Sequence, residues 1–303
     1  MQQRSLVGLL AITFTAIIWG LSFLSIKVSV AVLPPMTLAL SRFLIASVIL
    51  KVVLGLAEPQ TALSKKDYPL MAVAGVVGVT LYFFFENNGV KFTTASAASL
   101  IIATIPILTL VADYIFCGNK LSTLKTFSVA LSTIGVYLIV AVDNLSSSNL
   151  KGNLLMFGAA LCWVVYTLVT RPLSKKYSQL AVVTYQTLFG TLALIPFALL
   201  EHNQWQPVST VVMANVAFLG IFCSALGYYL YVYAMDALGV STVSLFINLV
   251  PVVAVAAGYY VLNEPISSSQ IVGGIIIILS VYLASWQKQT DPAPILCAEN
   301  AEG

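Results

Sequence analysis

The amino-acid sequence contains an internal duplication that covers nearly its whole length. When the first half is shifted by 144 or 145 positions, glycine, tryptophan, serine and proline residues fall on identical residues of the second half. The matching pairs are Gly8 and Gly152, Trp19 and Trp163, Gly75 and Gly220, Ser96 and Ser241, Ser99 and Ser244, and Pro106 and Pro251. A repeat of this length duplicates a whole structural unit, so we expect two similar halves.

The composition predicts that these halves lie in a membrane. Hydrophobic residues make up 59% of the 303 residues and charged residues 8%, whereas a soluble domain has about 25% charged residues. Because about 20 apolar residues in a helix cross the hydrocarbon core, the apolar stretches can be counted as spans of an all-α polytopic membrane protein. We expect ten spans, near 5–27, 36–54, 69–90, 94–116, 123–142, 152–172, 179–200, 210–233, 238–262 and 269–286.

Ten transmembrane helices over two copies give five helices per repeat, and this odd number predicts that the repeats are inverted. After five crossings the chain is on the other side of the membrane, so the second copy enters upside down relative to the first. We expect a first five-helix repeat over 1–147, a second over 148–287, and a disordered cytoplasmic tail over 288–303.

The positions of the basic residues predict the orientation in the membrane, because cytoplasmic loops carry the excess of lysine and arginine. With the N-terminus inside, only Lys27, Lys91 and Lys151 lie outside. Both termini are therefore expected in the cytoplasm of a cell with a bacterial-type inner membrane. The net charge of +3 reports this topology and indicates no nucleic-acid partner. The four cysteines have no paired spacing, so neither a disulfide framework nor a metal site is expected.

Several short features occur in a fixed order along the ten expected spans. They are the Trp-Gly of the first span, Pro34-Pro35 before the second, Arg42 within the second, the prolines in the fourth and ninth, and Glu264-Pro265 after the ninth. Over residues 5 to 286 the chain resembles the EamA-like branch of the drug/metabolite transporter superfamily. This resemblance implies a central cavity lined by spans 1, 3, 4, 6, 8 and 9, and alternating access. Asn119 stands in the first half where the second has Glu264, so a glutamate acting equally in both halves is not expected.

The residues themselves also favour transport. Inverted repeats place a pseudo-two-fold axis in the membrane plane, and a site on that axis can be opened to either side when one half rocks against the other. Spans 4 and 9 each carry a polar stripe on one helical face that ends in a proline. The stripes are Ser96, Ser99, Ala103 and Pro106, and Ser241, Ser244, Asn248 and Pro251. Each proline leaves a carbonyl four residues back for a substrate. Alternatively, the serines bond to their own helix and the prolines only bend it.

Aromatic and polar residues of the other spans complete the candidate cavity. Trp19 and Trp163 lie too deep in their spans for an interfacial belt, at about 21 and 16 Å. Tyr82 shares a face with Glu86, although a solvated helix end remains the alternative for Glu86 and the residues after it. The candidate substrate-binding residues are Trp19, Ser22, Tyr82, Ser99, Pro106, Trp163, Tyr166, Tyr229, Ser244, Asn248 and Pro251.

Charged residues within spans are costly and are usually paired or functional. Arg42 and Glu86 lie at similar depths, and we expect them to pair in an outer gate or to serve in ion coupling. Asp113 lies near the cytoplasmic end of its span, where solvent or a basic residue can meet it.

The predicted function is secondary transport, with export of amino acids or related amphipathic compounds. The sequence has no nucleotide-binding loop and no catalytic metal-ligand pattern, so an enzyme is not expected and no cofactor is required. A carrier of sugar phosphates or nucleotide sugars, a channel and an intramembrane enzyme remain the alternatives. The expected partners are a small-molecule substrate and the lipid bilayer, with proton coupling left open and a monomer or homodimer as the assembly.

Overall fold

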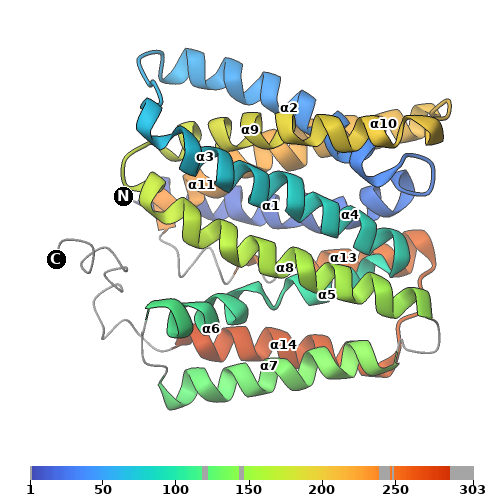
Figure 1. The fold of residues 1–303 in the computed structure, drawn as a ribbon. Helices are drawn as coiled ribbons and strands as arrows, with labels where there is room; N and C mark the ends of the chain where they lie inside the picture. The colour runs from blue at the N-terminus through green and yellow to red at the C-terminus, as the bar shows by residue number, and fades with distance from the viewer. Residues whose placement is uncertain (1, 118–121, 143–146, 239–245, 248, 287–303) are drawn as a thin grey trace.

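The computed structural model describes residues 2–117, 122–142, 147–238, 246–247 and 249–286. Over these residues the chain forms helices that run side by side, and no strand occurs among them (Figure 1). Within the described ranges, seven helices are long and apolar enough to cross a membrane, and three shorter apolar helices accompany them. The chain is thus the all-α, polytopic membrane protein of two five-span repeats that the sequence predicts.

In the first repeat, two of the five spans are interrupted. The helices are α1 (Gln2–Ser29), α2 (Pro35–Ala57), α3 (Tyr68–Gly75) continuing through the π-helix η2 (Val76–Leu81) into α4 (Tyr82–Phe92), α5 (Ala95–Ile102) followed by α6 (Ile105–Cys117), and α7 (Thr123–Val142). The break between α5 and α6 falls just before Pro106, whose ring cannot continue the hydrogen-bonding pattern of a helix.

The second repeat follows the same plan. Its helices are α8 (Ser147–Ser174), α9 (Gln179–Leu200), α10 (Thr210–Phe218) continuing through the π-helix η5 (Leu219–Leu226) into α11 (Gly227–Leu238), α13 (Leu249–Leu262) and α14 (Ser268–Trp286). The expected tail 288–303 lies outside the described residues, and the expected span 238–262 lies partly outside them.

Local sequence signals set the starts of several helices. Pro35 occupies the first turn of α2, where its missing amide hydrogen costs nothing. The side chains of Thr94, Ser178 and Ser209 accept hydrogen bonds from the backbone amides three residues on, at the starts of α5, α9 and α10. These N-caps satisfy amide groups that have no partner within the helix.

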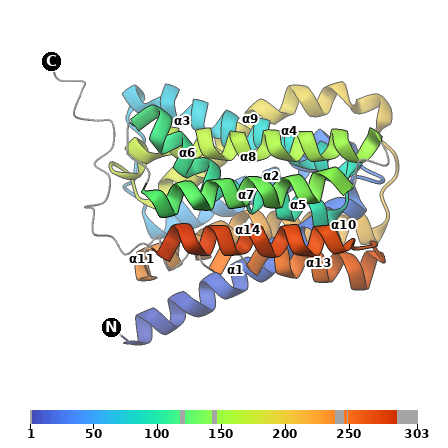
Figure 2. The same ribbon diagram turned by 90° about the horizontal axis from the view of Figure 1, so that it is seen from below.

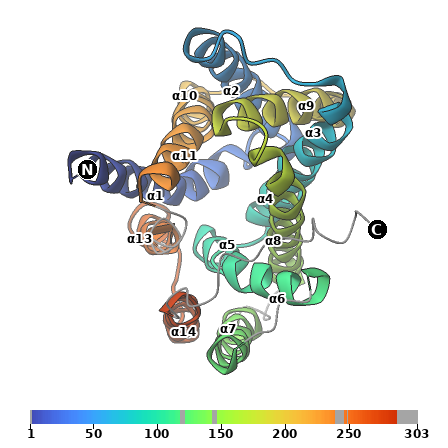
Figure 3. The ribbon, with the colours of Figure 1, turned by 90° about the vertical axis from the view of Figure 1, so that its left-hand side faces the viewer.

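The repeats exchange their first helices. α1 packs against α11 and α13 of the other repeat, whereas α8 packs against α4 and α5. α2 pairs with α9, and α7 pairs with α14 at one edge of the bundle (Figure 3). α1 begins and α14 ends at the same end of the bundle, which we call the termini side (Figure 2).

Contacts between equivalent residues locate the pseudo-two-fold axis. The hydroxyl oxygens of Ser47 and Thr191, 144 positions apart, are hydrogen-bonded at 2.9 Å where α2 crosses α9. Gly75 packs against the Gln186 carbonyl, and its equivalent Gly220 packs against the carbonyl of Arg42. Since Arg42 and Gln186 are themselves equivalent, each helix contact occurs twice, once in each orientation. The axis therefore passes between α2 and α9.

Candidate functional site

Two equivalent aromatic clusters join the repeats in the interior of the bundle. In one, the Trp163 ring lies 5.2 Å, between centroids, from both Tyr82 and Tyr166. In the other, Trp19 lies 5.5 Å from Tyr228 and 5.4 Å from Tyr231. Each tryptophan comes from the first helix of one repeat and contacts a tyrosine from the third span of the other. The structure thus brings together the predicted residues Trp19, Tyr82, Trp163 and Tyr166, with Tyr228 and Tyr231 in addition.

The π-helices position these rings. The indole of Trp19 donates a hydrogen bond to the Cys223 carbonyl in η5, at 2.9 Å. Gly227, directly after η5, leaves space for that indole, because a Cβ there would lie 2.7 Å from Nε1. In η2, a Cβ on Gly78 would collide with the Tyr166 ring. π-helical segments frequently mark functional sites in helices, and here they occur at equivalent positions of both repeats.

Arg42 is buried beside these clusters, with 3% of its surface exposed. Its Nε donates to the Ser224 hydroxyl at 3.0 Å, and its guanidinium carbon lies 4.7 Å from the centroid of Phe83 and 5.4 Å from that of Phe43. Its Nη1 has no hydrogen-bond partner. Stacking on aromatic faces holds the guanidinium while leaving part of its donor edge unused.

Glu86 is also buried, with 5% exposed. Its Oε1 accepts a hydrogen bond from the Tyr82 hydroxyl at 2.9 Å, and its Oε2 has no partner. Asn87 is fully buried and donates to the Pro35 carbonyl at 2.8 Å. The solvated-end alternative is therefore wrong for Glu86 and Asn87, whereas Asn88 is only partly buried and donates to the Phe84 carbonyl of its own helix at 2.8 Å.

The expected ion pair between Arg42 and Glu86 is not formed in this conformation. The guanidinium bonds to Ser224 and the carboxylate to Tyr82. The two groups are nevertheless held by neighbouring residues, since the guanidinium lies over Phe83 and the carboxylate accepts from Tyr82.

Two of the predicted substrate-binding serines form hydrogen bonds within their own helices. The hydroxyl of Ser22 donates to the Trp19 carbonyl at 2.6 Å and that of Ser99 to the Ser96 carbonyl at 2.8 Å. Both serines thus bond within their own helix, as the alternative interpretation had it. Pro106 follows the break between α5 and α6, and Pro251 is buried in α13. Ser244 and Asn248 lie outside the described residues.

A cavity of about 250 Å³ lies between α2, α9 and α11, towards the termini side. Tyr228 lines it and also contacts Trp19, so the cavity reaches one of the aromatic clusters. Tyr229, a predicted binding residue, lines this cavity and does not join the clusters. The other lining residues are Leu50, Ala57, Glu58, Ser178, Gln179, Leu180, Val183 and Tyr233.

The opposite side is closed by hydrogen bonds between the repeats. The carboxylate of Glu264 accepts from the backbone amides of Ala95 and Ser96, at 2.8 and 3.2 Å, and from the Ser96 hydroxyl at 2.8 Å. The Thr93 hydroxyl donates to Asn153 Oδ1 at 2.7 Å. These contacts fix the start of α5. The sequence identifies Glu264 as part of the Glu-Pro motif after a span and as an asymmetry between the halves, but it does not predict these hydrogen bonds.

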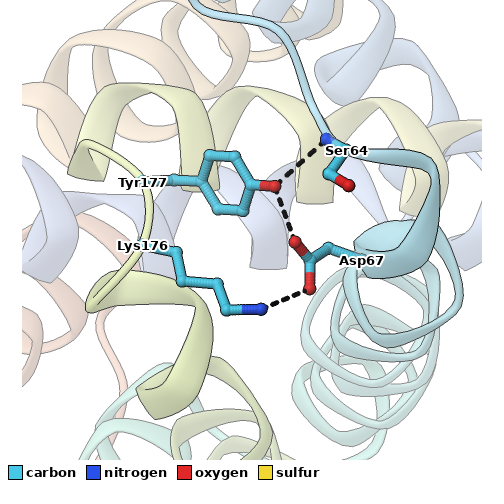
Figure 4. Close-up of polar contacts among 4 residues, drawn as sticks. All are labelled: Ser64, Asp67, Lys176 and Tyr177. Carbon is cyan, nitrogen blue, oxygen red and sulfur yellow. Dashed lines mark hydrogen bonds and ion pairs between the residues drawn. The ribbon is translucent and has the colours of Figure 1, made fainter.

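On the termini side, a polar cluster joins the start of α3 to the loop between α8 and α9 (Figure 4). The Tyr177 hydroxyl donates to Asp67 Oδ2 at 2.7 Å and accepts from the Ser64 amide at 3.0 Å, while Lys176 Nζ lies 2.9 Å from Asp67 Oδ1. The hydrogen bond that Tyr177 donates to the Asp67 carboxylate raises the pKa of the Tyr177 phenol. The hydrogen bond that Lys176 donates to the same carboxylate raises the pKa of the Lys176 ammonium group.

Substitution of Asp67 should therefore change the titration of Tyr177. We expect Asp67→Asn to lower the pKa of Tyr177, because an amide neither repels the phenolate nor accepts as strongly from the phenol. The alkaline absorbance titration of the protein, minus that of a Tyr177→Phe variant, isolates this one phenol. The same subtraction in the Asp67→Asn background should show an earlier midpoint, and an unchanged midpoint would contradict the assignment.

Comparison with known proteins places this architecture in a family. The profile described as the EamA-like transporter family matches the chain twice, over residues 6–141 and 150–286. An uncharacterised transporter of Archaeoglobus fulgidus is 33% identical over 285 residues, covering 91% of this chain and 96% of the relative. A probable terminal-alkyne amino-acid exporter of Streptantibioticus cattleyicolor is 28% identical over 276 residues, covering 90% and 91%.

The fold has a counterpart among solved structures. A crystal structure with 21% sequence identity aligns with a TM-score of 0.64 over 94% of this chain and 99% of its own. Among the described residues, no group of three histidine, cysteine, aspartate or glutamate side chains could hold a metal ion. The two matches to the family profile and the 33% identical relative show that the chain belongs to the EamA-like transporter family.

Proposed function

We propose that this protein is a secondary transporter that exports amino acids or related small amphipathic compounds by alternating access. The observation that carries the proposal is the pair of aromatic clusters built from both repeats, with Arg42 and Glu86 buried beside them. Aromatic faces suit an apolar side chain, and buried charged groups suit the polar end of the same molecule. One relative is named a probable amino-acid exporter, which supports the same substrate class.

The arrangement of the two ends supports alternating access. Bonds from Glu264 and Asn153 hold the opposite side together, whereas a cavity lies towards the termini side. If the basic residues set the orientation as proposed, the termini side faces the cytoplasm of a bacterial-type cell. The substrate would then enter from the cytoplasm and leave after the repeats rock about the axis between α2 and α9.

The charge of the site disfavours phosphorylated substrates. Arg42 is buried beside the clusters with one guanidinium group, and the buried Glu86 carboxylate, held by Tyr82, opposes further negative charge. A phosphate group with two negative charges would need more positive charge than one guanidinium supplies. Sugar phosphates and nucleotide sugars are therefore the less suitable alternative.

Counterflow in proteoliposomes tests the proposal. Vesicles loaded with an unlabelled amino acid should take up the same labelled amino acid well above the rate of protein-free vesicles. The panel should include phenylalanine, leucine, threonine and, as the competing class, glucose 6-phosphate. Counterflow of the phosphorylated sugar alone would reject amino-acid transport.

A further inference from the structure

Two buried side chains of opposite charge keep unused hydrogen-bonding atoms next to the aromatic clusters. Five buried side-chain atoms among the described residues lack a partner, and the charged groups among them are Arg42, through Nη1, and Glu86, through Oε2. Both residues are more than nine-tenths buried. An unpaired charged group inside a membrane protein is costly, so its presence points to a ligand.

The fold places these two groups at one site. The guanidinium of Arg42 lies over the Phe83 ring, and the preceding residue on the same helix, Tyr82, donates to Glu86. The rings of Tyr82 and Phe83 are in contact, with 4.9 Å between their centroids, so two neighbouring rings hold the two charged groups. Since the two charges form no direct ion pair, each leaves an atom for a third group.

We propose that Arg42 binds the carboxylate and Glu86 the ammonium group of a zwitterionic amino acid. This inference rests on the proposed function and names the chemical groups that the site recognises. The planar guanidinium presents parallel N–H donors that match a carboxylate, and Nε is already held by Ser224, which fixes the fork in place. Glu86 Oε2 can accept from the ammonium while Tyr82 holds Oε1.

The aromatic clusters then receive the side chain. Trp163 and Tyr166 adjoin Tyr82, the residue that holds Glu86. Tyr228 adjoins Trp19 and packs against the hydrophobic cluster that contains Phe43 and Phe83, the two rings beside Arg42. An amino acid bound by its two charged ends would therefore have aromatic surface on both sides for its apolar part.

The chemistry predicts discrimination between analogues that lack one charged end. A buried polar group that loses its partner bears the full cost of desolvation, so such sites reject the incomplete analogue strongly. An amide, which lacks the carboxylate, would leave Arg42 unpaired. A deaminated acid, which lacks the ammonium, would leave Glu86 unpaired.

The experiment compares counterflow of L-phenylalanine, L-phenylalaninamide and 3-phenylpropionate at about pH 6, where the amide is a cation. The unsubstituted protein should prefer phenylalanine to either analogue by about tenfold or more. Arg42→Gln should remove the preference over the amide and keep that over 3-phenylpropionate. Glu86→Gln should remove the preference over 3-phenylpropionate and keep that over the amide.

Further variants separate recognition from misfolding. Arg42→Lys keeps the charge without the fork, and its preference over the amide should be intermediate. Lys66→Gln, which changes an exposed residue on the termini side, should leave both ratios unchanged.

Three outcomes would overturn the inference: equal transport of all three compounds, variants that slow transport without changing the ratios, or a Glu86→Gln variant that loses only the response to a pH gradient. Absence of transport for every amino acid would instead reject the proposed function itself. Transport of phenylalanine with equal transport of its amide rejects the zwitterion site alone.

Discussion

The Gly75→Ala variant should unfold at a markedly lower temperature than the unsubstituted protein. Gly75 lies in a helical conformation, with φ −63°, so alanine is compatible with its backbone and would even raise the helix propensity. The surrounding atoms leave no space for the alanine side chain, because a Cβ would collide with the Gln186 carbonyl and lie 3.1 Å from the amide nitrogen of Gly190. Backbone atoms of a packed helix cannot move aside as a flexible side chain can.

The expected size follows from these opposing effects. Overpacking costs about 1–3 kcal/mol, while replacing glycine by alanine in a helix returns up to about 1 kcal/mol. The net loss should be about 1–2 kcal/mol, and the thermal unfolding midpoint in detergent should fall by several degrees. Because Gly75 and Gly220 make equivalent contacts, Gly220→Ala should lower the midpoint in the same way.

Gly55 provides a matched control. It lies near the end of α2, and a Cβ there would meet no atom within 4 Å. Gly55→Ala should therefore leave the midpoint unchanged or raise it slightly. If Gly55→Ala and Gly75→Ala behaved alike, the close crossing of α3 and α9 would not be the cause, and the inferred position of the axis would be in doubt.

The fold could be predicted from the sequence because its main determinants act over one helix length. Apolar stretches of about 20 residues define spans, and an odd number of spans per copy requires inversion whatever the details of packing. The depth of Trp19 and Trp163 along their spans likewise placed them inside the bundle, where the structure has them.

Features that depend on one residue of register could not be predicted. The π-helices η2 and η5 differ from an α-helix in that each hydrogen bond spans one residue more, and a continuous apolar stretch gives no sign of that change. Likewise, Ser22 and Ser99 lie on polar faces, but the rotamer of each hydroxyl decides whether it bonds to its own helix or to a ligand.

Partners that lie far apart in the chain were also missed. Glu264 bonds to residues 168 and 169 positions away, and nothing in its local sequence identifies α5 as its partner. Glu201 bonds in the same way to Met36 and Thr37 at the start of α2. Both carboxylates compensate amide groups at the start of a helix of the other repeat, and only the folded arrangement shows it.

The Glu264→Gln variant should open the opposite side of the bundle more often. Glutamine keeps one acceptor oxygen but replaces the other by an amide group that repels the Ala95 and Ser96 donors. Hydrogen bonds to a charged group contribute about 1.5–3 kcal/mol, so the loss of one shifts the balance between closed and open states by about tenfold or more. The bonds cross between the repeats, so their weakening favours separation of α5 from α13.

A cysteine at Ala98 can report this opening. Ala98 lies one turn into α5 and is fully buried. In a background without the four native cysteines, a water-soluble maleimide should label Ala98→Cys faster when Glu264→Gln is present. Glu201→Gln is the matched control, because Glu201 makes the same set of bonds, two from backbone amides and one from a hydroxyl. It joins the start of α2 to the end of α9, and these two helices pack against each other in a part of the bundle away from α5 and α13 (Figure 3). Glu201→Gln should therefore leave the labelling rate unchanged, and equal acceleration by both variants would mean that Glu264 contributes to general stability and does not control access.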